Sequence, residues 1–345
     1  MLVVAIAATP GPAGGVAPEP AMSSSPRYVP AADAPFFVVL NAGSGHGDAG
    51  RRQAELVAVL EGAGRRCQVA IVTHGRRLPA VAEQMAAQAE QAHGVLVACG
   101  GDGTLNAVAQ QAWRLQLPFG IVPQGTFNYF GRTYGFPTDV AAAARLLLQS
   151  HVQPVQVGLV NDHVFLINAS LGLYPQLLED REAYKQRFGR SRWVALGAAL
   201  ATLWQSHRRL WLEIETEAGI RRLLTPTLVV ANNPLQLEQV GIADHGALAN
   251  GRLVAMALKP IGTLGLYGLV LRGAMSRLGE AERVIRFDVG DMRVRGRRRA
   301  GGRVKVAMDG EIHHLPAPLR FRVAPAPLHL LVPVPVPPGQ HRGLP

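Results

Sequence analysis

The chain has 345 residues, of which 48% are hydrophobic and 17% are charged, so a folded core is expected and a wholly disordered chain is excluded. The formal net charge of +11 favours anionic partners such as phosphorylated substrates, nucleic acid or an anionic membrane surface, although richness in arginine can also reflect genome composition alone. Lysine occurs only at positions 185, 259 and 305. Residues 1–184 therefore contain neither a Walker A loop nor the third-strand lysine of a protein kinase.

The two ends of the chain differ in composition from the rest. Residues 1–34 are rich in alanine, proline, glycine and serine and are expected to form a disordered leader, and the proline-rich residues 334–345 to form a loose tail. No lysine or arginine precedes the short N-terminal apolar run, which makes it a poor secretory signal. No apolar run reaches the ~18 residues that a membrane span needs.

The only cysteines, Cys67 and Cys99, lie in strand-like apolar runs and are expected to be small core residues. They form neither a disulfide framework nor a metal-ligand cluster. This fits a reducing compartment, so a cytoplasmic location is expected, with peripheral attachment to the inner face of the membrane as an alternative.

From residue 36 onward, short apolar runs alternate with segments of helical spacing. This alternation predicts βαβ units around a parallel sheet, and so a doubly wound α/β nucleotide-binding domain over residues 35–150. The expected strands are 36–40, 67–72, 95–99 and 119–122, and the expected helices are 51–60, 78–92, 104–115 and 139–149.

The pattern changes near residue 151 to short strands that follow one another through turns. It predicts a second, β-rich domain over residues 151–333. The expected strands are 155–160, 164–168, 210–216, one ending at 233, 253–258, 284–289, 304–308 and 319–323, with helices at 177–207 and 262–279.

Glycine-containing loops follow the first, third and fourth expected strands. Ligands of open parallel sheets bind beyond the carboxyl ends of the strands, so the three loops are expected to meet at one edge. The loop Gly100-Gly-Asp-Gly-Thr104 can point backbone N–H groups at an anion, and Asp102 adds a carboxylate suited to Mg²⁺. An ordinary left-handed turn is the alternative. The spacing is not the GxGxxG of a dinucleotide-binding fold, which argues against a dehydrogenase.

The other two loops carry weaker signals. Asn41-Ala-Gly-Ser-Gly45 could merely connect two elements. Gly125-Thr-Phe-Asn128 offers a hydroxyl and an amide to the same edge, but Thr126 could instead cap a helix.

These loops occur in a recognisable order together with Phe130, Arg132 and Asp309-Gly-Glu311. Together they resemble the diacylglycerol kinase catalytic-domain family, which includes sphingosine kinases and soluble bacterial lipid kinases and is more distantly related to NAD kinases. The resemblance runs from about residue 36 to residue 333. It implies an α/β nucleotide-binding domain followed by a β-sandwich-like domain, with the site in the cleft between them. The positions it assigns to ATP are Asn41, Gly43, Ser44, Gly45, Thr73, Gly100, Gly101, Asp102, Gly103, Thr104, Asn106, Gly125, Thr126 and Asn128.

The same resemblance implies that Asp309, Glu311 and Asp102 are the catalytic carboxylates. Glu311 would accept the proton of a lipid hydroxyl as that hydroxyl attacks the γ-phosphorus. Side chains two residues apart on a strand share a face, so Asp309 is expected beside Glu311, where it would hold Mg²⁺ with Asp102. The alternative is that Asp309-Gly-Glu311 is only a turn between strands.

Two positions depart from the family pattern. Tyr129 stands where the family often has aspartate, which bears on substrate choice. Neutral Asn250 replaces the carboxylate of a segment that holds a structural Mg²⁺ in some bacterial members, so that metal is doubtful here.

The densest basic stretch, residues 293–305, is interpreted either as a solvated hairpin or as a contact for anionic lipid. Nucleic acid is not expected as a partner, since no recognition motif is present and aromatic residues make up only 6% of the chain.

The sequence therefore predicts an ATP- and Mg²⁺-dependent lipid kinase that meets its substrate at a membrane surface, with diacylglycerol or a related lipid as acceptor. A sphingoid base, phosphatidylglycerol or another alcohol is the alternative acceptor. A catalytically retired regulator that binds nucleotide or lipid is the alternative function, and a homodimer stays open.

Overall fold

The computed structural model describes residues 25–44, 48–173, 175, 209–239, 241–242, 246–260, 284–296 and 302–333. The expected helices at 177–207 and 262–279, the expected tail at 334–345 and the site residue Gly45 lie outside the described residues. Most of the expected leader, residues 1–24, lies outside them too. Among the helices that the structure describes, none is both long enough and apolar enough to span a membrane.

A six-stranded sheet forms the centre of the first domain, in the order β2-β1-β3-β4-β18-β5. Its first four strands are parallel, and β1, β3 and β4 are buried almost throughout, as continuous apolar runs require. The expected parallel α/β domain is therefore confirmed. The strands are β1 (Phe36–Asn41), β2 (Cys67–Val72), β3 (Val95–Gly100), β4 (Phe119–Pro123), β5 (Ser150–Val155) and β18 (Leu328–Pro333).

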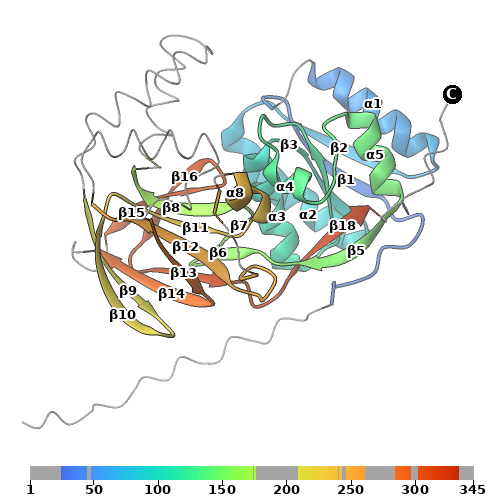
Figure 1. Ribbon diagram of the computed structural model, residues 1–345. Coiled ribbons are helices and arrows are strands. Elements are labelled where there is room, and N and C mark those ends of the chain that lie inside the picture. The colour runs from blue at the N-terminus through green and yellow to red at the C-terminus, as the bar shows by residue number, and fades with distance from the viewer. Residues whose placement is uncertain are drawn as a thin grey trace, which may run out of the picture.

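Helices cover this sheet and are packed through apolar stripes into one core with it. In Figure 1 they surround the sheet in the α/β half of the molecule, which is coloured blue to green. They are α1 (Ala49–Gly62), the short 3₁₀ helix η1 (Gly75–Arg77), α2 (Leu78–Gln91), α3 (Asp102–Leu115), α4 (Tyr129–Thr133) and α5 (Val140–Leu148).

Strand β18, and β5 apart from its first residue, lie within residues 151–333, the range expected for the second domain. Strand β18 nevertheless pairs with β4 and, in antiparallel register, with β5. Further bonds attach this return of the chain to α3, because Trp113 Nε1 donates to the carbonyl of Ala326 over 2.9 Å and the His329 ring lies 3.1 Å from Gln116 Oε1. Strand β18 thus completes the first sheet. The order of segments along the chain does not indicate this pairing.

The second domain packs two antiparallel six-stranded sheets face to face, as expected. Their orders are β10-β9-β14-β17-β6-β7 and β13-β12-β11-β8-β15-β16, and apolar residues from both sheets form one core. The strands are β6 (Gly158–Val160), β7 (His163–Phe165), β8 (Asn168–Gly172), β9 (Leu210–Thr216), β10 (Gly219–Thr225), β11 (Thr227–Ala231), β12 (Leu253–Leu258), β13 (Val284–Val289), β14 (Asp291–Gly296), β15 (Arg303–Met308), β16 (Glu311–Pro316) and β17 (Leu319–Val323), and the short helix α8 (Pro234–Gln239) follows β11.

The last ten residues of the expected leader are packed against the first domain. The Tyr28 hydroxyl donates to the carbonyls of Ala89 and Gly94 over 3.0 and 2.7 Å, and the Arg27 side chain forms an ion pair with Glu90. A disordered leader over all of residues 1–34 is therefore wrong for residues 25–34. The composition of residues 25–34 did not indicate that Tyr28 anchors them to the first domain.

Candidate active site

The three glycine loops meet at the carboxyl edge of the first sheet. Asn41 Nδ2 donates to Thr104 Oγ1 over 2.9 Å, which joins the loop after β1 to the start of α3. The backbone N–H of Gln124 donates to the carbonyl of Gly100 over 2.7 Å, which joins the loop after β4 to the loop after β3. A Cβ at Gly125 would lie 2.8 Å from the Cα of Gly101, so this approach of the two backbones requires glycine.

Asp102 lies where two helices begin. It is the first residue of α3, so this helix starts two residues earlier than the expected Thr104. Backbone N–H groups of Asn128, Tyr129 and Phe130, at the start of α4, act on its carboxylate as donors that favour the charged form. Burial raises the pKa of Asp102, while these three donors lower it.

One carboxylate oxygen of Asp102, Oδ1, is buried and has no hydrogen-bond partner. A buried polar atom without a partner is costly. A carboxylate oxygen in this position suits a hard divalent cation such as Mg²⁺ or one of its water ligands. The residues present thus fit the metal that the family resemblance implies.

Asn128 shapes the loop after β4 from inside. It is 3% exposed; its Oδ1 accepts from the N–H of Gly125 over 2.6 Å and its Nδ2 donates to the carbonyl of the same residue over 2.8 Å. Asn128 also has a left-handed φ of 50° and is the N-cap residue of α4. The alternative in which Thr126 caps this helix is therefore wrong, and Thr126 is exposed.

Asp309 does not lie on a strand beside Glu311. The register pairs Met308 with Glu311, so Asp309 and Gly310 form a two-residue hairpin turn with φ values of 47° and 90°, as a type I′ turn requires. The expectation that both carboxylates share one face of a strand is wrong. The turn alternative describes the backbone correctly.

The Asp309 carboxylate points back into the second domain. Its two oxygens accept from the backbone N–H groups of Leu166, Ile167 and Asn168 over 2.7–3.0 Å. Asn106 Nδ2 on α3 also donates to Oδ2 over 2.8 Å and to the carbonyl of Val164 over 2.7 Å. Burial raises the pKa of Asp309 to about 6 despite these donors. Asp309 and Asn106 thus tie α3 to the second domain rather than standing free for a ligand.

Glu311, the first residue of β16, lies against the start of α3. A Cβ at Gly103 would lie 2.8 Å from Oε1 of Glu311, so a larger residue at position 103 would displace the Glu311 carboxylate from its present position. The glutamate of the second domain is therefore brought beside the glycine loop and Asp102 of the first domain.

The structure also describes Thr73, Gly43 and Ser44, which the family resemblance assigns to ATP. Thr73 is exposed just beyond β2, and its hydroxyl hydrogen-bonds with the His74 ring. Gly43 N–H donates to Asn41 Oδ1 over 3.0 Å, which tightens the loop that also carries Ser44. For the doubted structural metal near Asn250, the described residues contain no group of three or more histidine, cysteine, aspartate or glutamate side chains that could hold an ion.

The described part of the basic stretch 293–305 is built into the sandwich. Arg295 lies 3.8 Å from Glu213 and 3.7 Å from Glu215 across the neighbouring strand. Arg303 donates to the carbonyl of His314. These contacts agree with the solvated-hairpin interpretation for those two arginines.

Sequence reasoning missed Arg52, which is 4% exposed and donates to the carbonyls of Ser44 and Ala42. A signal existed, because Arg52, Leu56 and Leu60 recur every four residues and form the buried face of α1.

Known proteins resemble this chain in sequence. Residues 35–160 match the family described as the diacylglycerol kinase catalytic domain. A diacylglycerol kinase of Staphylococcus saprophyticus is 40% identical over 92 residues, which are 26% of this chain and 30% of that protein. An uncharacterized Synechocystis protein is 26% identical over 248 residues, 69% of this chain and 55% of that protein. The resemblance predicted from the motifs is thus confirmed, over about a third to a half of the length of these relatives.

The fold is shared over both domains. A solved structure described as a diacylglycerol kinase from Bacillus anthracis superposes with a TM-score of 0.63 at 18% identity, and the match covers 86% of this chain and 96% of that one. At this identity the likeness establishes the two-domain architecture.

Proposed function

We propose that this protein is an ATP-dependent lipid kinase that transfers the γ-phosphate of ATP to the hydroxyl of diacylglycerol or a related lipid. The observation that carries the proposal is the position of Glu311, a second-domain carboxylate packed against Gly103 at the mouth of the glycine loops. The match of residues 35–160 to the diacylglycerol kinase catalytic domain supports the same reaction.

In this proposal the first domain binds ATP through its three loops. Backbone N–H groups of Gly101 to Gly103 and the N-terminal end of the 14-residue helix α3 would face the phosphates, where partial positive charge favours anions. Asn41, Gly43 and Ser44 would form one side of the site, and Thr73, Gly125, Thr126 and Asn128 would complete its edge. Gly45, which lies outside the described residues, stays a prediction of the family resemblance.

Asp102 would hold Mg²⁺ through its unpartnered Oδ1, and the ion would supply charge neutralisation at the β- and γ-phosphates. Asp309 was expected to share this role. Both of its oxygens already accept hydrogen bonds, so we assign it instead to holding Glu311 in place through the two-residue turn.

Glu311 would act as general base. Its carboxylate accepts the proton of the lipid hydroxyl, the hydroxyl oxygen bonds to the γ-phosphorus, and the bond from that phosphorus to the β–γ bridging oxygen breaks to release ADP. A sphingoid base or phosphatidylglycerol could serve as the acceptor alcohol in the same geometry, and Tyr129 beside the site bears on that choice. A retired regulator would bind ATP without this proton transfer.

The substitution Glu311→Gln separates a kinase from a regulator. We expect the variant to bind ATP within about threefold of the wild-type Kd and to lose on the order of 100-fold or more in kcat, because the amide cannot accept the proton. Binding is measured by calorimetry and turnover by ADP release in lipid micelles.

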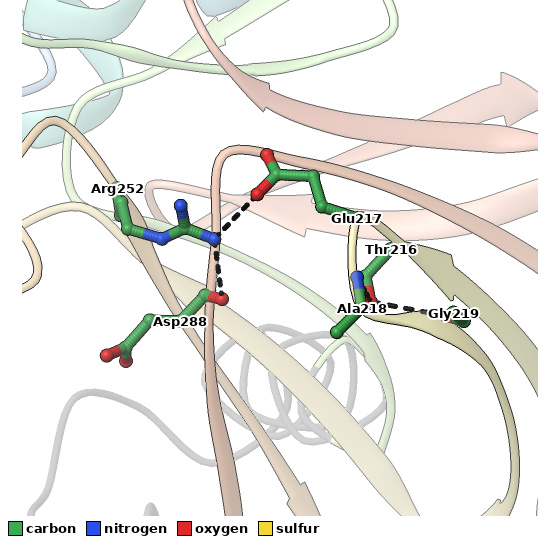
Figure 2. A network of polar contacts seen from close by, with 6 residues as sticks. All are labelled: Thr216, Glu217, Ala218, Gly219, Arg252 and Asp288. Atoms are coloured by element: carbon green, nitrogen blue, oxygen red, sulfur yellow. Dashed lines mark hydrogen bonds and ion pairs between the residues drawn. The ribbon is translucent and has the colours of Figure 1, made fainter.

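Glu217→Gln is the matched control. Glu217 lies in the β9–β10 turn, where its carboxylate forms an exposed ion pair with Arg252 over 2.9 Å, seen in Figure 2. Exposed pairs contribute about 1 kcal/mol or less, so this variant should keep full turnover. Unchanged turnover in Glu311→Gln would contradict the assigned base.

A further inference from the structure

The α1 helix carries two adjacent arginines in opposite environments. Arg51 has an exposed side chain that forms an ion pair with Glu55 over 2.8 Å. Arg52 is only 4% exposed. Burying a guanidinium is costly unless it is paired or hydrogen-bonded, so the position of Arg52 calls for a compensating partner.

The partners of Arg52 are backbone carbonyls of the first glycine loop. Nη1 donates to the carbonyl of Ser44 and Nη2 to the carbonyl of Ala42 over 3.2 Å. The third nitrogen, Nε, is buried without a hydrogen-bond partner. Among the acidic side chains that the structure describes, none forms an ion pair with Arg52, so no counter-charge on the described chain neutralises its guanidinium.

The charge of Arg52 also reaches the second loop. Burial raises the pKa of the Cys99 thiol to about 12, and the positive charge of Arg52 acts against this rise. Cys99 is followed directly by Gly100, where the Gly-Gly-Asp-Gly loop begins. The guanidinium is thus hydrogen-bonded to the loop after β1, and its charge acts on the residue that precedes the loop after β3.

We propose that Arg52 is the internal cation of the nucleotide site. It holds the backbone of residues 42–44 in position, and its unneutralised charge attracts the phosphates of ATP from below the loops. In a P-loop a lysine supplies that charge, whereas residues 1–184 of this chain contain no lysine. The inference rests on the proposed function, because it presumes that these loops bind ATP.

The test compares the binding of ATP and of adenosine to the full chain. Arg52→Gln removes the charge, Arg52→Lys keeps it, and Arg51→Gln is the control on the same helix. We expect Arg52→Gln to weaken ATP binding by on the order of tenfold to 100-fold, as for loss of a charge-assisted contact, while adenosine binding changes by less than about twofold. Arg51→Gln should match the wild type for both ligands.

Three outcomes would overturn the inference. The first is wild-type ATP affinity in Arg52→Gln, and the second is an equal loss of ATP and adenosine binding, which indicates collapse of the loop alone. If Arg52→Gln does not fold, Arg52→Lys decides: it must bind ATP within about tenfold of the wild type, and a larger loss contradicts a role of the charge. A wild-type protein that bound no ATP would instead refute the proposed function.

Discussion

Asp102 combines two features of a phosphate- and metal-binding site. It stands at the start of a helix, which favours anions, and its carboxylate favours cations. It is the first residue of α3, and backbone N–H groups at the start of α4 favour the charged form of its carboxylate. One carboxylate oxygen, Oδ1, is buried and has no hydrogen-bond partner. A preorganised oxygen of this kind binds a cation without first having to reorganise.

The substitution Asp102→Asn tests this arrangement. The amide has nearly the same shape but no negative charge, so we expect the Mg²⁺ concentration for half-maximal activity to rise by on the order of tenfold or more. A Mg²⁺ titration of kinase activity measures the shift, and thermal unfolding checks the fold. An unchanged Mg²⁺ requirement would show that the metal, if needed, is held elsewhere.

At the residue scale the sequence predicted the loops better than the carboxylates. A glycine loop directly after a buried strand has few structural alternatives, and Gly101, Gly103 and Gly125 all lie at close approaches. The direction in which Asp309 points depends on the pairing of β15 with β16. The Asp-Gly dipeptide is a strong hairpin signal, but its carboxylate binds N–H groups about 140 residues earlier in the chain, which no local pattern indicates.

The α3 helix is the element that connects the two domains. Gly103 in its first turn contacts Glu311, Asn106 one turn later donates to Asp309 and Val164, and Gln110 accepts from the N–H of Val164 over 2.7 Å. In Figure 1 this helix lies between the first sheet and strands β7 and β16. One helix face thereby sets the distance between the glycine loops and Glu311.

The Asp309 turn gives this connection a pH dependence. Its carboxyl has a folded pKa of about 6, above the ordinary value of 3.8, so the folded state holds a proton that the unfolded chain has released. The stability that this group contributes is fully present below about 3.8 and is lost as the pH rises through about 6. We expect the advantage of the wild type over Asp309→Asn in unfolding free energy to shrink by roughly 2 kcal/mol between pH 4 and pH 7.

Urea unfolding of both proteins across this pH range measures the difference. Subtracting the variant removes the contributions of the other titrating groups, which the two proteins share. A difference that grows with pH would mean that the four N–H donors hold Asp309 ionised. In that case the upward shift in the pKa of Asp309 would be wrong.

At the scale of the whole molecule, the chain leaves the first domain after β5 and returns to it in β18. Because β18 pairs with both β4 and β5, the first domain is completed only after the whole second domain in the sequence. The alternation of strands and helices predicted the α/β domain correctly, and the succession of short strands predicted the β-rich domain. It could not predict the closing strand, since the apolar run 328–333 reads equally well as another strand of the sandwich.

The central claim is that the two domains together transfer phosphate from ATP to a lipid. Its most direct test is incubation of the full chain with γ-³²P-labelled ATP, Mg²⁺ and micelles of diacylglycerol, phosphatidylglycerol or a sphingoid base, followed by separation of the lipids. We expect a labelled phospholipid from diacylglycerol or a related lipid, and none from Glu311→Gln. An absence of label in every lipid, although the wild type binds ATP, would contradict the account.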